Sequence, residues 1–303
     1  MSNDPLSDIL RMTEAKAVVS GAVSAGGRWA IHVVPRAQIV FAAIAQGACW
    51  LRLDGRKRSV RLEQGDVGLL SGRDGFVLCS SLAVPAIDVP PADRWGETFK
   101  IGDGSGCTWL VGKVALQAAS AFRVAEALPA MIHVRGSTPG AASLRWIVHE
   151  LIEEQRAQLA GASIASAQLA QLFFVKILRA HLASAGALPS GWLRAVSDQR
   201  IAEALRVMHS RPGRDFRLSE LASAAGMSRT RFAVRFKSVA GVPPLTYLTA
   251  WRMLLAQRAL RDEDTSILEL GASLGYASES AFSNAFKRVT GAAPRDYRRS
   301  ARA

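Results

Sequence analysis

The chain has 303 residues, of which 49% are hydrophobic, so it is long and apolar enough to bury two cores of ordinary domain size. Its formal net charge of +13 lies mainly in the last third. Residues 200–303 carry 18 Lys and Arg against 9 Asp and Glu, whereas residues 1–199 carry 20 against 16. This basic excess suits a polyanionic partner, either nucleic acid or an anionic membrane surface.

Cysteine usage and hydropathy narrow the class of protein further. Three widely spaced cysteines, Cys49, Cys79 and Cys107, give neither a disulfide framework nor the C-x-x-C spacing of a zinc site. The opening MSNDPLSDILRMTEAK lacks the basic and apolar regions of a signal peptide. The longest apolar stretch, residues 165–178, is shorter than the ~20 residues of a membrane span. These features predict a soluble cytoplasmic protein with no membrane partner.

Short apolar or alternating runs, separated by Gly, Asp-Gly and Pro, follow over residues 28–90. They read WAIHVVP, QIVFAAIAQGACWLRLDG, RSVRLEQGDVGLL and GFVLCSSLAV. Regular short strands with turn signals between them predict a small β-sandwich or barrel. The phrase CWLRLDGRKRSVRLEQGDVGLL and the opening DPLSDIL resemble a cupin-type domain, which implies a cupin-like barrel over about residues 5–110.

Cupins often hold a metal ion through clustered histidines, and this region lacks them. Of the five histidines only His32 lies among the predicted strands, and the segments FAAIAQG and GRDGFVL, where the cupin pattern places ligands, contain none. We therefore expect no metal, no other cofactor and no catalytic residue. The domain is expected to bind a small effector or to serve as a scaffold, and a metal-dependent cupin enzyme with an appended nucleic-acid-binding domain stays open as an alternative. Ala-rich strands without a conspicuous charge cluster favour a neutral or weakly polar ligand, whose binding residues are unknown.

Helical patterns occupy the middle of the chain. They read VALQAASAFRVAEALP (114–129), SLRWIVHELIEEQRAQL (143–159) and IASAQLAQLFFVKILRAHL (164–182). His149 and Glu153, at i and i+4, could share a metal ion, but they lie on the polar face of an amphipathic helix, where solvated charge is the better interpretation. The segment SAGALPSGWL (184–193) indicates a linker.

The last third of the chain contains an internal repeat. GMSRTRFAVRFKSVAG (226–241) matches GYASESAFSNAFKRVTG (275–291) at an offset of 50 in the helix, and of 49 upstream of the turn. The second turn therefore has one extra residue. Each copy is predicted to contain an apolar-periodic helix, a turn opened by Gly in the left-handed conformation, and a second helix. Each copy is thus a predicted helix-turn-helix.

In the second helix of each copy the phenylalanines form one inward stripe, so the opposite face is exposed to a partner. Short polar side chains, Asn and flanking basic residues on that face are typical of a helix in a DNA major groove, where they reach base edges and phosphates. The wheel directs Thr230, Ala233, Val234, Ser280, Ser283 and Asn284 toward bases. Phosphate contacts are expected from Arg229, Arg231, Arg235, Lys237, Lys287 and Arg288.

A predicted helix over PPLTYLTAWRMLLAQRALR (243–261) joins the two copies. At 1.5 Å per residue it would be ~28 Å long, near the ~34 Å between successive major-groove faces of B-DNA. Residues 197–299, including ILELGASLGYASESAFSNAFKRVTGAAPRDYR, resemble the DNA-binding domain of the AraC/XylS family of transcription regulators. The resemblance implies two helix-turn-helix units joined by a long helix, and it adds Glu279 to the base-facing positions. One departure is Arg217, which stands where the second copy has the capping-box residue Ser266, so the first scaffold helix is expected to start less firmly.

These patterns together predict an α+β chain. Its parts would be a cupin-like effector-sensing β-barrel with flanking helices (1–112), a helical dimerisation or connecting region (113–185), a linker (186–196) and an all-α DNA-binding domain with two helix-turn-helix units (197–303). The helices of the second part could pair two chains or pack within the core of one. We expect a sequence-specific transcription regulator, not an enzyme, in which a small-molecule effector shifts the population of two arrangements. The resemblance implies promoter DNA and RNA polymerase as partners, a homodimer, and activation as the usual sign of regulation. A nonspecific DNA-binding protein is the second alternative.

Overall fold

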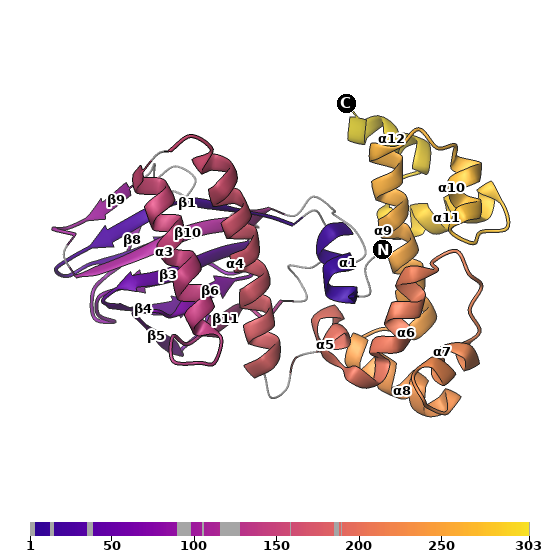
Figure 1. Cartoon of the computed structure of the whole chain (residues 1–303), viewed down its shortest axis with the longest axis horizontal. Coiled ribbons are helices and arrows are strands. Elements are labelled where there is room, and N and C mark those ends of the chain that lie inside the picture. Colours follow the sequence, from indigo (N-terminus) through magenta and orange to yellow (C-terminus); the bar gives the residue numbers. More distant parts are fainter. Residues whose placement is uncertain are drawn as a thin grey trace. The chain divides into compact units, whose positions relative to one another are not determined.

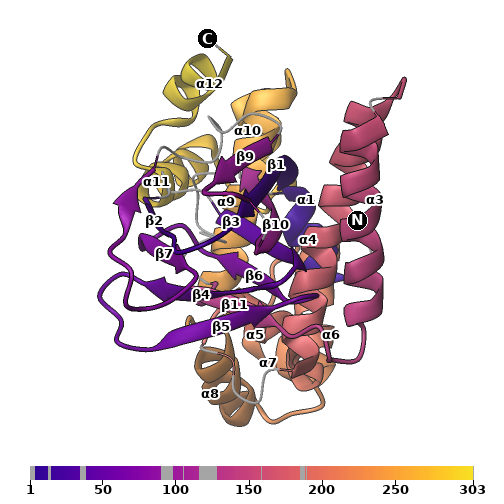
Figure 2. The same cartoon turned by 90° about the vertical axis from the view of Figure 1, so that its left-hand side faces the viewer.

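The computed structural model of the chain describes residues 4–12, 15–34, 39–89, 98–104, 106–115, 128–157, 159–184, 188 and 190–302. Contacts between elements divide it into a β-rich unit, from residues 16–115 and 128–186, and a helical unit, to which the described parts of 1–15 and 187–303 belong. Figures 1 and 2 together label the elements of both units. The short helix at the start of the chain thus groups with the helical unit, although the expected division assigned residues 1–112 to a single domain.

Two sheets form the β-rich unit. One has six strands in the order β11-β6-β3-β10-β1-β9, and the other has five in the order β5-β4-β7-β2-β8. Neighbouring strands run antiparallel, except that β1 pairs with β9 and β2 with β8 in parallel. The strands are β1 (Lys16–Ala25), β2 (Ala30–Val33), β3 (Ile39–Gln46), β4 (Ala48–Leu53), β5 (Ser59–Glu63), β6 (Val67–Leu70), β7 (Phe76–Cys79), β8 (Ile87–Asp88), β9 (Thr98–Ile101), β10 (Cys107–Ala115) and β11 (Met131–Val134).

The inward faces of both sheets enclose one apolar core. Because side chains alternate along a strand, Leu51 and Leu53 of β4 are buried while Arg52 between them is exposed. Trp29 and Trp109 stack in this core with ring centroids 5.3 Å apart. The predicted mixture of a β domain and a helical domain is confirmed. Among the described strands no ladder joins the two sheets, so the closure expected of a barrel is not confirmed.

Helices α3 (Ala141–Ala157) and α4 (Ala162–Ser184) pack on the six-stranded sheet, as Figures 1 and 2 show. Phe173 of α4 meets Phe41 of β3 edge to face, with ring centroids 5.3 Å apart. The helices predicted at 143–159 and 164–182 are therefore present, whereas most of the third pattern, 114–129, lies outside the described residues. The side chain of His149 is 70% exposed, in agreement with a solvated charge.

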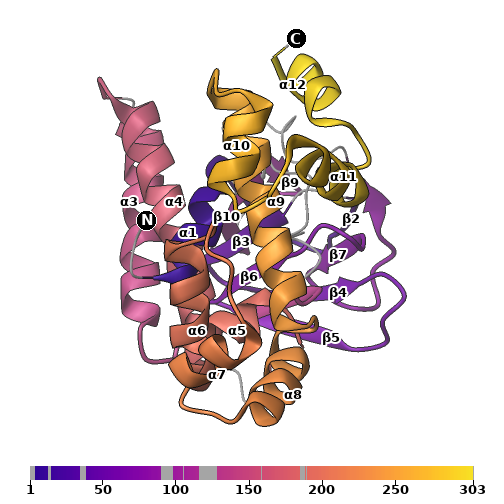
Figure 3. The ribbon, with the colours of Figure 1, turned by 90° about the vertical axis from the view of Figure 1, so that its right-hand side faces the viewer.

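The helical unit is built around one long central helix, α9, which lies between the other helices in Figure 3. α9 has 19 residues, as predicted, and starts one residue later than expected. Within the described ranges, every helix is too short or too polar to cross a membrane. The helices of this unit are α1 (Pro5–Met12), α5 (Trp192–Ser197), α6 (Gln199–Ser210), α7 (Leu218–Ala224), α8 (Arg229–Ala240), α9 (Pro244–Asp262), α10 (Ile267–Ser273), α11 (Glu279–Thr290) and α12 (Pro294–Arg302).

Candidate DNA-binding interface

The two turns of the helix-turn-helix units have the predicted geometry. Gly226 follows α7 with φ +62° and Gly275 follows α10 with φ +82°, both in the left-handed region that glycine adopts without strain. The next helix is capped by Ser228, whose Oγ accepts from the Arg231 N–H at 3.4 Å, and by Ser278 in the second copy. The turns comprise residues 225–228 and 274–278, so the second has the extra residue that the offsets predicted.

The two scaffold helices start differently. α10 opens with the predicted capping box, in which the Glu269 N–H donates to Ser266 Oγ at 3.1 Å and the Ser266 N–H donates to Glu269 Oε2 at 3.2 Å. In α7 the Arg217 N–H donates to Glu220 Oε2 at 2.7 Å, but an arginine side chain has no acceptor for the reciprocal bond. That N–H, together with the nearby Arg214 guanidinium, lowers the pKa of Glu220. α7 therefore begins with one cap bond fewer than α10.

The repeat supplies the same aromatic core to both units. Every phenylalanine of the stripe is fully buried, and each unit ends its core with a tyrosine from the following helix. Ring centroids lie 5.6 Å apart for Phe232–Phe236 and 5.5 Å for Phe236–Tyr247, against 5.8 Å for Phe282–Phe286 and 5.4 Å for Phe286–Tyr297. Each second helix therefore packs on its support through equivalent pairs of rings at similar spacing.

With the phenylalanines buried, the opposite faces of α8 and α11 are open to solvent. Thr230 and Val234 on α8 and Ser280 and Asn284 on α11 are exposed, and each pair lies one helical turn apart. Val234 is 67% exposed, so its methyl groups are accessible to a partner. The other predicted base-facing residues, Ala233, Glu279 and Ser283, are half-buried beside them.

Basic side chains border both faces, and one of the predicted phosphate ligands has another partner. Arg229, Arg231, Lys237, Lys287 and Arg288 are exposed. Arg235 instead places Nη2 2.7 Å from Oδ2 of Asp198, the N-cap residue of α6. Glu279 similarly lies 3.4 Å from Arg295 Nη2 of α12. These two ion pairs join α8 to the start of α6 and α11 to α12.

A contact between two glycines, which no local sequence pattern indicates, joins the two helix-turn-helix units. Gly213, in the loop between α6 and α7, packs directly on the second turn. A Cβ atom on Gly213 would lie 2.2 Å from the Ser273 carbonyl oxygen, and one on Gly275 would lie 2.3 Å from the Gly213 carbonyl oxygen. Only residues without a side chain permit this approach of the two backbones.

Arg252 of α9 connects the loop between α6 and α7 to the turn between α10 and α11. Its Nε donates to the Pro212 carbonyl at 2.7 Å and its Nη2 to the Arg214 carbonyl at 2.9 Å. Its guanidinium carbon also lies 5.7 Å from the centroid of the Tyr276 ring in the second turn. The contact between Gly213 and Gly275 and the bonds of Arg252 together connect the loop between α6 and α7 to the turn before α11, and we call them the junction.

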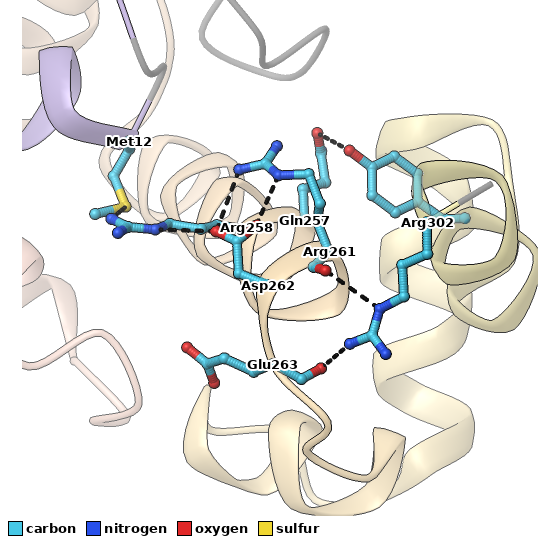
Figure 4. Close-up of polar contacts among 8 residues, drawn as sticks. Met12, Gln257, Arg258, Arg261, Asp262, Glu263 and Arg302 are labelled. Carbon is cyan, nitrogen blue, oxygen red and sulfur yellow. Dashed lines mark hydrogen bonds and ion pairs between the residues drawn. The ribbon is translucent and has the colours of Figure 1, made fainter.

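The C-terminal end of α9 is held to the last helix, as Figure 4 shows. Arg302 of α12 donates from Nε to the Arg261 carbonyl at 3.2 Å, and its guanidinium also bonds the Glu263 carbonyl. Asp262 lies 2.9 Å from Arg261 Nε and 3.5 Å from Arg258 Nε. The two Arg302 bonds satisfy carbonyls at the end of α9, which would otherwise lack hydrogen-bond partners, and Asp262 adds ion pairs in the last turn.

The helix at the start of the chain is an integral part of this unit. α1 contacts α5, α6 and α9, and Ile9 on its inner face is fully buried. At its end, Met12 Sδ lies 3.8 Å from Arg258 Nη1 of α9 (Figure 4). Asp8 of the same helix is only 1% exposed, a rare environment for a carboxylate.

Asp8 faces a buried histidine of α6. Asp8 Oδ2 lies 3.5 Å from His209 Nδ1, and His209 Nε2 lies 3.0 Å from the Tyr247 hydroxyl. The His209 ring stacks on Trp251 with centroids 3.9 Å apart. Burial lowers the pKa of His209 to about 4 although the nearby Asp8 opposes this shift, and burial raises the pKa of Tyr247. His209 is therefore neutral at pH 7, with its Nε2 able to accept a hydrogen bond from Tyr247.

Lowering the pH from 7 to 5 should destabilise the helical unit by about 2 kcal/mol through His209. Its folded pKa of about 4 lies below the unfolded value of about 6.5, so the folded state binds fewer protons in this window. The contribution to stability is complete above pH 6.5 and is lost as the pH falls toward 4. Urea unfolding of the full chain at both pH values, for wild type and His209→Gln, isolates this term. An identical pH dependence in the two proteins would contradict it.

Comparison with known proteins bears on both units. Residues 4–183 match a family model described as Cupin, and residues 221–300 match one described as Helix-turn-helix domain. A putative AraC-like transcription regulator of Streptomyces antibioticus is 35% identical, and one of Streptomyces lividans is 34% identical, each over 98% of this chain and 98% of its own. The HTH-type transcriptional regulator AlkR of Acinetobacter baylyi is 27% identical over 91% of this chain and 92% of its own.

Two solved structures are also similar in part. The DNA-binding domain of AdpA, in complex with a target DNA, covers 34% of this chain and 93% of its own at 35% identity, with a TM-score of 0.33. ToxT of Vibrio cholerae O395 covers 94% of this chain and 96% of its own at 14% identity, with a TM-score of 0.37.

The predicted family is confirmed by the sequence relatives. The Cupin model matches residues 4–183, more than half of the chain, and the two Streptomyces regulators exceed 30% identity over nearly the whole length. The helix-turn-helix match, 221–300, includes the two exposed helix faces described above. The chain belongs to the AraC family of DNA-binding transcription regulators, with a cupin domain in its N-terminal part and a helix-turn-helix domain in its C-terminal part.

Proposed function

We propose that the helical unit reads two adjacent major grooves of a promoter and that a small effector bound by the β-rich unit controls its occupancy. The observation that supports this most strongly is the matched pair of exposed faces on α8 and α11. They are joined by the 19 residues of α9, which span ~28 Å against the ~34 Å repeat of successive grooves. One chain can therefore engage one side of the duplex twice.

The proposed roles divide the exposed residues into two sets. Asn284 would bond an adenine edge, and Ala233 and Val234 would contact thymine methyl groups. Arg235 and Glu279 would first have to leave Asp198 and Arg295 to reach DNA. The proposed base-facing set is Thr230, Ala233, Val234, Glu279, Ser280, Ser283 and Asn284, and the proposed phosphate set is Arg229, Arg231, Arg235, Lys237, Lys287 and Arg288.

Fluorescence anisotropy of the full chain tests this function. The protein is titrated with a duplex from the region upstream of its own gene and with a scrambled duplex, each at two salt concentrations. A specific excess of ~10³-fold that persists at the higher salt is expected of a sequence reader. Equal and steeply salt-dependent binding to both duplexes, with and without candidate effectors, would favour a nonspecific DNA-binding protein.

Arg252→Met should weaken binding to a duplex with two half-sites by about tenfold, but binding to a single half-site by less than about threefold. The substitution removes both hydrogen bonds at the junction while it keeps the aliphatic stem, so each unit stays folded and their spacing loosens. Each charged hydrogen bond lost is worth ~1.5–3 kcal/mol. Arg206→Met on α6, which pairs with Glu203, is the matched control. Equal losses on the two duplexes would show that Arg252 does not set the spacing.

Pairing of two chains is proposed for the helical region 113–185. Most large apolar side chains of its described helices are buried, but a few are exposed, including Trp146 at 55% and Ile164 at 69%. Such a surface suits a symmetric contact between two copies, and sedimentation equilibrium of the full chain tests it. Two paired chains would engage four major-groove faces.

The proposed regulator acts in the cytoplasm, with the β-rich unit as sensor, residues 186–196 as linker and residues 197–303, on which α1 packs, as DNA reader. RNA polymerase would be its partner if it activates transcription. In the described residues no three His, Cys, Asp or Glu side chains form a metal site. Elemental analysis of the purified protein tests the rival cupin enzyme, which requires bound metal.

A further inference from the structure

A cleft opens along one side of the β-rich unit. It lies between β5, which ends the five-stranded sheet, and β11, which ends the six-stranded sheet, and Figure 2 shows these two strands near each other. The cleft has a volume of about 1100 Å³, and sites for small organic ligands are typically ~300–1,000 Å³. Because the two strands do not pair with each other, the seam between the sheets is open at this point.

Arginines dominate the polar lining of this cleft, which we call the arginine cleft. Arg56 and Arg58 come from the turn between β4 and β5, Arg61 from β5, and Arg135 from the residues after β11. Guanidinium groups bind carboxylate and phosphate groups through two parallel hydrogen bonds, and they stay charged at any physiological pH.

The two carboxylates in the lining do not cancel this charge. Asp66 is buried, and its oxygens accept from His133 Nε2 at 2.8 Å and from the Gly136 N–H at 2.7 Å. Glu63 lies 3.4 Å from Arg61 Nε. Because both side chains are more than half exposed, the attraction within this ion pair is weak. Arg56, Arg58 and Arg135 therefore face the cleft with no carboxylate of the lining dedicated to them.

The floor of the arginine cleft is apolar. Leu51 and Leu53 reach it from the core and are 1% and 7% exposed, and Val60 and Met131 are half-buried beside them. A purely ionic partner, such as the phosphate backbone of a duplex, would make no contact with an apolar floor. The combination of a concave apolar floor with a rim of arginines is complementary to a small molecule that has one charged and one apolar end.

We propose that the arginine cleft binds a small organic anion, with a carboxylate, phosphate or sulfonate group among the arginines and an apolar body on Val60 and Met131, beneath which Leu51 and Leu53 lie. This inference rests on the proposed function and deepens it, because it gives the chemical class of the effector. It departs from the neutral or weakly polar ligand that the Ala-rich strands favoured. The charges come from one loop and from a segment about 75 residues later, Arg135, which only the fold brings together.

The full chain is titrated with 8-anilinonaphthalene-1-sulfonate, an anionic dye, and with N-phenyl-1-naphthylamine, its neutral analogue. Saturable binding of the anionic dye is expected, at least about fivefold tighter than that of the neutral one. Arg56→Gln/Arg58→Gln should raise the Kd of the anionic dye about tenfold or more, as expected for loss of charged hydrogen bonds. Arg28→Gln/Arg52→Gln removes two exposed arginines of the same unit outside the cleft and should change it less than about twofold.

Three outcomes would overturn the proposal: no saturable binding of the anionic dye, an unchanged Kd in Arg56→Gln/Arg58→Gln, or equal affinity for the neutral dye. Far-UV circular dichroism and urea unfolding of both double variants verify that they fold. Duplex binding is measured in parallel on the same proteins. If the wild-type chain binds the dye through its arginines but shows no specific DNA binding, the proposed function is contradicted and the cleft assignment stands. If it binds DNA specifically but the dye does not depend on the arginines, the cleft assignment is contradicted and the proposed function stands.

Discussion

Phe282→Ala should destabilise the second helix-turn-helix unit by about 3–5 kcal/mol and abolish its contribution to DNA binding. The ring is fully buried, with centroids 5.5 Å from Tyr276 and 5.8 Å from Phe286. The surroundings cannot collapse into the cavity, because α10 already packs at its closest: a Cβ atom on Gly271 would lie 3.0 Å from Phe282 Cβ. The lost burial and the residual cavity therefore add up.

Hydrogen exchange of the full chain measures this effect element by element. Protection of α10, α11 and α12 should fall strongly in Phe282→Ala, while that of α7 and α8 changes less. Phe232→Ala, the equivalent change in the first copy, should show the opposite pattern and is the matched control. A loss below about 1 kcal/mol in urea unfolding would mean that the second unit does not depend on this core.

The double helix-turn-helix could be predicted because its determinants are local. Phe232, Phe236 and Val239 recur at helical spacing, and Gly226 marks the turn within a few residues of them. The same short-range rules apply to the second copy, so the repeat gave an independent check on each element. The exposed positions then follow from the buried ones, since a helix has only one opposite face.

Contacts between distant residues could not be predicted in this way. Asp8 and His209 meet through α1 and α6, which are separated by nearly the whole β-rich unit in sequence. Gly213 likewise packs against the carbonyl oxygen of Ser273, which is 60 residues later in the chain. For the contact of Asp8 with His209, the sequence signal is an acidic residue in the apolar face of PLSDILRM. No local pattern indicates the Gly213 contact.

The same reason applies to two features of charge that only the structure shows. Arg235 lies on the solvent side of a helical wheel, but Asp198, 37 residues earlier, caps α6 within its reach. The string RKRSVR (56–61) holds four basic residues, which the expectation of a neutral or weakly polar ligand left out of account. Its position on a cleft depends on β5 and β11 ending their sheets without pairing, which strand propensity does not specify.

Asn284→Ala should weaken binding to the cognate duplex by about 1–3 kcal/mol and leave binding to random DNA nearly unchanged. Asn284 is exposed in the middle of α11, one turn beyond Ser280, where an amide can bond the N6 and N7 positions of adenine. Lys287→Ala, one turn further along in sequence but expected at a phosphate, is the matched control. It should weaken both duplexes alike and lower the slope of log K against log salt by about one.

Anisotropy titrations at several salt concentrations separate the two kinds of contact. A base contact changes the ratio of specific to random affinity and leaves the salt slope alone, whereas a phosphate contact changes the slope and leaves the ratio alone. If Asn284→Ala weakens both duplexes equally, the assignment of the exposed face of α11 to the bases is wrong. The basic border and the polar face would then have a single role, and recognition would have to come from α8, whose exposed Val234 offers a thymine contact of its own.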